Sequence, residues 1–137
     1  MNKIKGLLWV LMLISCAAEN QNLTTTFEFD HPFKIKIEET RINEGSELSI
    51  SFDQVLEDSR CPANVRCIWA GNAKVKLWFN NGTKEIPFNL NTHRGEGFRQ
   101  DTIIDNIYIK LLGLSPYPGT PEYEMEAFQA ELLVERD

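Results

Sequence analysis

Apolar and polar residues alternate along several short runs of the chain, the first of which begins at Phe33. An alternation of period two is typical of a strand with one face buried and the other in water. The alternating apolar positions are Phe33, Ile35 and Ile37; Leu48, Ile50 and Phe52; Val75, Leu77 and Phe79; Ile86, Phe88 and Leu90; and Ile107, Ile109 and Leu111. Trp78 falls on the face opposite to its neighbours. These runs predict strands and no long helix.

A turn signal separates two of these runs. Asn81-Gly82 is a pair that tolerates positive φ at both centres of a tight hairpin, so residues 73–79 are expected to pair with residues 84–90. Pro87 lies inside the second run and cannot donate a backbone hydrogen bond. We therefore expect 84–90 to be an edge strand or a bulged one.

Residues 123–135 have an ambiguous pattern. Glu, Ala, Met and Leu in this segment favour helix, with Met125, Phe128 and Leu132 on one face. As a strand, Tyr123, Met125 and Ala127 alternate, the phase slips once as at a bulge, and alternation resumes from Phe128 to Val134. We favour the strand. With about six or seven short strands, the chain is expected to form a single all-β, antiparallel, immunoglobulin-like sandwich.

The N-terminus has the pattern of an export signal. Lys3 and Lys5 precede an apolar run over 6–14, which is shorter than a membrane-spanning helix. The sequence Leu13-Ile14-Ser15-Cys16 follows, and it resembles the lipobox of bacterial lipoproteins. This resemblance implies that Cys16 is lipidated and that residues 1–15 are removed. An ordinary secretory signal with an incidental cysteine is the alternative.

The resulting organisation is a signal peptide over 1–15, a lipidated cysteine with a polar tether over 16–26, and a sandwich domain over 27–137. Several acyl chains hold a protein stably, because each buried methylene contributes about 0.8 kcal/mol. We therefore expect a protein of the bacterial cell envelope, anchored by lipid and facing the periplasm or the surface, with the outer membrane the favoured location.

The net charge of the chain limits the kinds of molecule that it can bind. The 14 basic and 20 acidic residues give a net charge of -6, and removal of Lys3 and Lys5 with the signal changes it to -8. An acidic chain without a basic cluster repels phosphate backbones, so we expect no nucleic acid partner. An envelope protein or a glycan is the expected kind of partner.

Cys61 and Cys67 lie six positions apart around Pro62. Once Cys16 carries lipid they form an even pair in an oxidising compartment, so a structural disulfide is the favoured interpretation. Two alternatives stay open. A redox pair is usually Cys-x-x-Cys at a helix start, and zinc requires about four ligands, for which His31 and His93 are the available histidines. We predict no metal and no other cofactor.

Two segments around these cysteines resemble a group of small exported bacterial lipoproteins without established activity. They are Asp58-Ser59-Arg60-Cys61-Pro62 and Cys67-Ile68-Trp69-Ala70-Gly71. The stretches over 108–112, 116–118 and 123–134 are similar to the same group. The resemblance implies a discrete folded domain and supplies no catalytic residue.

The disulfide-closed loop is the candidate binding element. Its candidate residues are Arg60, Pro62, Asn64, Arg66 and Trp69. A rigid loop carrying arginine can enter the groove of a partner at low ordering cost, which suits a binding module or an inhibitor of a hydrolase. In the alternative, purely structural interpretation, Arg60 pairs with Glu57 or Asp58 and Trp69 belongs to the core.

Enzymatic function has little support in the sequence. The chain has no Gly-x-Ser-x-Gly, no glycine-rich phosphate loop and no His-Glu-x-x-His. A glycan hydrolase that uses two carboxylates stays open as an alternative, because acidic residues are abundant. We predict a non-catalytic binding or structural module.

Overall fold

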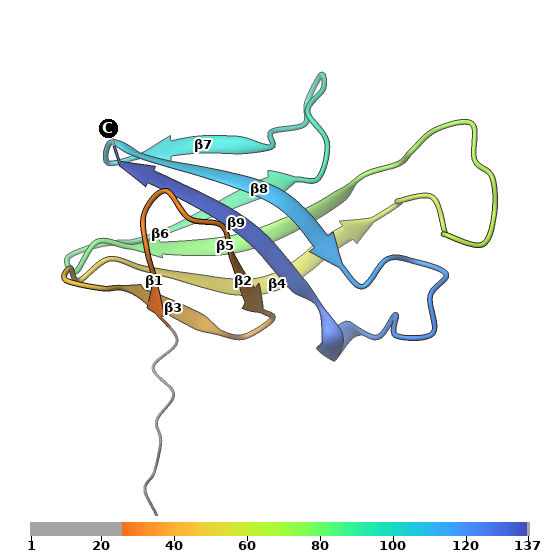
Figure 1. Ribbon diagram of the computed structural model, residues 1–137. Coiled ribbons are helices and arrows are strands. Elements are labelled where there is room, and N and C mark those ends of the chain that lie inside the picture. Colours follow the sequence, from red (N-terminus) through yellow and green to blue (C-terminus); the bar gives the residue numbers. More distant parts are fainter. Residues whose placement is uncertain (1–25, 137) are drawn as a thin grey trace, which may run out of the picture.

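The computed structural model describes residues 26–136, which form two packed β-sheets (Figure 1). The five-stranded sheet has the order β1 (Thr26–Phe27), β3 (Thr40–Asn43), β4 (Ser49–Asp58), β5 (Ala73–Asn80) and β6 (Glu85–Asn91). The four-stranded sheet has the order β2 (Phe33–Lys36), β9 (Gln129–Arg136), β8 (Ile107–Ser115) and β7 (Asp101–Ile104). The predicted all-β, immunoglobulin-like sandwich is confirmed. The predicted signal peptide, Cys16 and nearly all of the tether lie outside the described residues.

The sandwich has more strands than the sequence predicted, because three short ones escaped notice. β1 has only two residues, and β3 shows no apolar alternation because Asn43 is its buried residue whereas Ile42 is 40% exposed. β7 also directs Ile103 into water, where 66% of its surface is exposed. β1 pairs with β3 in parallel, whereas every other pair of strands is antiparallel.

The core lies between the two sheets and consists of the alternating side chains. The fully buried ones include Ile35, Ile50, Phe52, Val75, Leu77, Phe79, Leu90, Ile109, Leu111, Leu132 and Val134. Each such side chain contributes about 1.5–3 kcal/mol of burial free energy. Trp78 points to the opposite face as predicted, and its indole nitrogen donates a hydrogen bond to Asp53 at 3.2 Å.

The pairing of β5 with β6 is confirmed, but the turn between them is not the tight one expected. The last pair is Asn80 with Glu85, so four residues form the connection. Gly82 has a φ of 89°, while Asn81 does not have positive φ. The tight turn occurs instead between β7 and β8, where Asp105 and Asn106 have φ of 50° and 61°. β6 is an edge strand, as Pro87 predicted.

Residues 123–135 are a strand only in their second part. Gln129 pairs with Ser115, the last residue of β8, and with Lys36, the last residue of β2. Phe128 O still accepts from Ile37 N at 2.9 Å, and the strand pairing ends there. Residues 125–127 form a short 3-10 turn, η1 (Met125–Ala127), in place of the predicted first half-strand and bulge. Phe128, Ala130, Leu132 and Val134 are buried in alternation, as expected. No helix within 26–136 is long and apolar enough to cross a membrane.

Candidate functional site

The loop between β4 and β5, residues 59–72, extends well beyond the end of the sheets (Figure 1, yellow-green). We call it the stapled loop. Its base continues the pairing of the two strands: Ser59 N donates to Asn72 O at 2.8 Å, and Cys61 N donates to Ala70 O at 2.9 Å. Gly71 has a φ of 72°, and a Cβ atom there would lie 1.8 Å from Ser59 O. The base is therefore narrow and requires glycine.

Cys61 and Cys67 form the predicted disulfide, with a Cα–Cα distance of 5.8 Å. Closing so short a loop stabilises the fold by about 2 kcal/mol through the entropy of the unfolded chain. Both sulfurs are used in this bond, so neither is a thiolate ligand for zinc. Across residues 26–136 there is also no cluster of three or more His, Cys, Asp and Glu side chains that could hold a metal ion.

Arg60 holds the base of the loop from inside the protein. Its side chain is 2% exposed and pairs with Asp58, with Nη2 to Oδ2 at 2.6 Å and Nε to Oδ1 at 2.8 Å. Nη1 donates to Leu114 O near the end of β8 at 2.5 Å, and Nη2 also donates to Pro116 O just after β8 at 2.9 Å. The guanidinium also lies 4.7 Å from the ring centroid of Tyr117. Arg60 thus connects the stapled loop to a second loop.

The second loop, residues 116–128, joins β8 to β9 at the same end of the sandwich (Figure 1). We call it the acidic loop because Glu122, Glu124 and Glu126 are all exposed on it. Ala63 N donates to Pro118 O at 2.8 Å, and the Tyr123 hydroxyl donates to Asp58 Oδ2 at 3.0 Å. The two loops therefore form one joined structure.

The ionisation of Asp58 is set by this network. Burial alone raises the pKa of its carboxyl, but the hydrogen bonds and charge of Arg60, with a smaller contribution from Tyr123, outweigh burial and hold the pKa below the ordinary value of 3.8. The pKa of Tyr123 is raised, first by burial and then by its hydrogen bond to Asp58.

The junction of the loops is expected to open in acid before the sandwich unfolds. A carboxyl with a lowered pKa in the folded state stabilises that state above its unfolded pKa, and this stability is lost as the pH falls through the folded value. We expect the amide resonances of Cys61 and Ala63 to shift with a midpoint below 3.8, while that of Asn91 in β6 stays in place. A midpoint at or above 3.8 would contradict the assigned role of Arg60.

The outer part of the stapled loop exposes large apolar side chains. Ile68 is 93% exposed, Trp69 is 81% exposed and Val65 is 54% exposed. We call these three residues the apolar tip. Arg66 is the one charged residue between Cys61 and Asn72, and it is exposed as well. Grouped apolar side chains on a protrusion of a soluble domain are a usual sign of a contact surface.

The structure changes the roles of two predicted binding residues. Arg60 is wrong as a contact residue, because its guanidinium is buried and each of its three nitrogens donates within the protein. The predicted pairing of Arg60 with Asp58 is confirmed. The core interpretation of Trp69 is wrong, because the indole extends past the sheets and has no layer to pack on. Asn64 and Arg66 are exposed, and Pro62 is partly buried.

Sequence reasoning missed Val65 and Ile68. The signal was the pair Ile68-Trp69 directly after Cys67, two large apolar residues in a segment too irregular to be a strand. His31 and His93, considered as zinc ligands, are exposed and far from the disulfide in the chain. Their ring nitrogens contact Phe29 O and Thr92 Oγ1 respectively.

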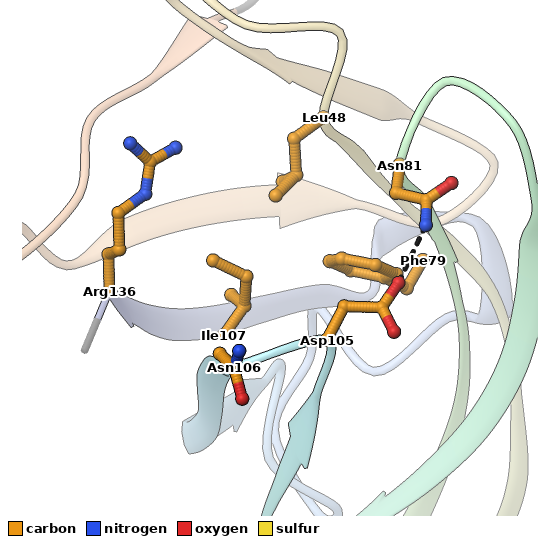
Figure 2. A pocket seen from close by; sticks show the side chains of 7 residues that line it. All are labelled: Leu48, Phe79, Asn81, Asp105, Asn106, Ile107 and Arg136. Carbon is orange, nitrogen blue, oxygen red and sulfur yellow. Dashed lines mark hydrogen bonds between the residues drawn. The ribbon is translucent and has the colours of Figure 1, made fainter.

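A hollow of about 340 Å³ lies at the other end of the sandwich (Figure 2). It is lined by Leu48, Phe79, Asn81, Asp105, Asn106, Ile107 and Arg136. Asn81 Nδ2 donates to Asp105 Oδ2 at 2.6 Å, and Asn81 Oδ1 accepts from Thr83 N and Lys84 N. These polar groups join the turns of the two sheets. Asp105 is the one carboxylate among the lining residues, whereas glycoside hydrolysis uses two.

No family model, curated protein or solved structure matches this chain. The fold and the site together define a β-sandwich that presents an apolar tip on a disulfide-closed loop. Its function therefore has to be argued from the site.

Proposed function

We propose that this protein is a lipid-anchored, non-catalytic binding module of the bacterial cell envelope, and that the stapled loop is its recognition element. The observation that carries the proposal is the exposure of Ile68 and Trp69 on a loop whose base is fixed. Exposing an indole to water is unfavourable, so a partner that covers it lowers the free energy of the complex.

The fixed base supports this function energetically. Ordering a flexible loop on binding costs about 0.5–1.5 kcal/mol for each immobilised side chain, in addition to the backbone. Here the disulfide and the network of Arg60 hold the loop before any partner arrives. The stapled loop therefore needs little further ordering when a partner binds the apolar tip.

Trp69→Ala is expected to leave stability almost unchanged and to abolish capture of the partner. Exposed substitutions usually change the free energy of unfolding by less than about 0.5 kcal/mol, whereas truncating a tryptophan at the centre of an interface costs about 2–4 kcal/mol of binding. The measurements are thermal unfolding and recovery of partners with the full-length protein purified from the cells that produce it. Ile103→Ala, at an exposed position on β7, is the matched control. Equal recovery with the wild type and Trp69→Ala would refute the proposed recognition element.

The anchor rests on the lipobox pattern at Cys16, which lies outside the described residues. Cys16→Ser is expected to eliminate labelling with radioactive fatty acid and to release the protein from membranes or leave it unprocessed, because the thiol is the acceptor of the lipid. Labelling of the variant at the wild-type level would mean that Cys16 is not lipidated. Cys61→Ser, which retains Cys16, is the control for loss of a cysteine.

A further inference from the structure

Two different kinds of surface meet at the loop end of the sandwich. Arg66 is the one charged residue of the stapled loop near the apolar tip, whereas the acidic loop, which joins the stapled loop at Pro118 and Gly119, carries Glu122, Glu124 and Glu126. Glu126 lies beside Ile37 and Glu38, between β2 and β3. Within residues 26–136 none of these three carboxylates forms a salt bridge. Their charge is therefore not neutralised by the described part of the chain.

The two surfaces are held in a fixed relation. Arg60 donates to the backbone on both sides of Ser115, Ala63 N bonds to Pro118 O, and the Asn64 side chain lies close against Gly119. Asn64 directly precedes Val65 of the apolar tip, so a partner that covers Val65 also approaches the acidic loop at Pro118 and Gly119.

We infer that the partner is a protein with an apolar cleft bordered by basic side chains. The protruding tip fits a concave surface, and the acidic loop fits a basic rim. This inference rests on the proposed function and names the class of its partner. A membrane surface is the competing occupant for an exposed tryptophan, but anionic headgroups would be repelled by the three glutamates and by the net charge, which is -8 once Lys3 and Lys5 are removed with the signal.

Charged residues at the rim of an interface mainly affect the rate of association. Complementary charges increase the rate of association by about tenfold or more, while the apolar centre of an interface determines how slowly the complex dissociates. Reversing the charge of the acidic loop should thus weaken capture with little effect on the fold, since the glutamates are exposed and form no salt bridge within residues 26–136.

Photocrosslinking in the producing cells tests the inference with the full-length protein. A photoreactive amino acid replaces Val65, which keeps Ile68 and Trp69, and the control replaces Ile103 on β7. We expect a protein adduct from position 65 and none from 103, with the crosslinked peptide in a cleft bordered by Lys and Arg. Glu122→Lys with Glu124→Lys should reduce the yield about tenfold. Glu47→Lys with Glu85→Lys, two exposed residues near the opposite end, should leave it unchanged.

The outcomes separate the inference from the proposed function. The absence of any adduct specific to position 65 overturns both. An adduct that contains lipid and no protein overturns the inference and leaves the loop as a contact element, this time with the membrane. A protein adduct whose yield is the same after both charge reversals, or whose crosslinked site has no basic rim, overturns the inference alone.

Discussion

Arg60→Met is expected to lower the free energy of unfolding by about 3–5 kcal/mol. Methionine keeps much of the volume of the side chain but removes its charge and donors. The carboxylate of Asp58, whose side chain is 7% exposed, then remains buried without its cation, and Leu114 O and Pro116 O lose their donors. Urea unfolding of the purified protein measures the loss.

Two variants identify the cause of this loss. Arg66→Met removes a cation from the same loop at an exposed position and should change stability by less than about 0.5 kcal/mol. Adding Asp58→Asn to Arg60→Met removes the unpaired charge and should recover part of the loss. If Arg60→Met and Arg66→Met unfold at the same urea concentration, Arg60 does not hold the loops together.

Gly71→Ala is expected to cost about 3 kcal/mol or more and to abolish partner capture. A left-handed backbone costs a residue with Cβ about 1–2 kcal/mol. At Gly71 the new Cβ would also lie 1.8 Å from Ser59 O, so the base of the stapled loop must widen and lose its hydrogen bonds, each contributing about 1 kcal/mol. Thermal unfolding and partner recovery give the two readouts.

Gly97→Ala is the matched control for backbone conformation. Gly97 has a φ of 80°, close to that of Gly71, but a Cβ atom there would have no neighbour within 4 Å. Gly97→Ala should therefore show the backbone cost alone, about 1–2 kcal/mol, with normal capture of the partner. Similar losses for the two variants would mean that the close approach to Ser59 is not what requires glycine at position 71.

The sequence predicted the sandwich because burial on one face of a strand leaves a period-two pattern. Ile50 and Phe52, or Leu77 and Phe79, have to be apolar for the sheets to pack, and the intervening residues do not. β3 and β7 were missed because they do not follow this pattern: β3 buries Asn43 and exposes Ile42, and β7 exposes Ile103. The disulfide was predicted because Cys61 and Cys67 are the two cysteines left once Cys16 carries lipid.

The site was predicted only in outline, since the roles of Arg60 and Trp69 depend on contacts across the chain. An arginine beside Asp58 has the same local sequence whether it points outward or inward. Carbonyl oxygens of Leu114 and Pro116, more than fifty positions away, decide that Arg60 points inward. Trp69 could not be assigned to the core or the surface until the length of the loop beyond the sheets was known.

The hydrogen bonds of Arg60 and Asp58 also determine the stage of folding at which the apolar tip is held in place. Its hydrogen bond to Leu114 O spans 54 positions, and the bond from Tyr123 to Asp58 spans 65. Contacts between distant parts of a chain form late in folding, because closing long loops costs entropy before any contact repays it. A chain in which β8 and β9 have not yet joined the sandwich therefore lacks the support for the apolar tip. Under the proposed function, partner binding would select fully folded molecules, because an incompletely folded copy would lack the support for the apolar tip.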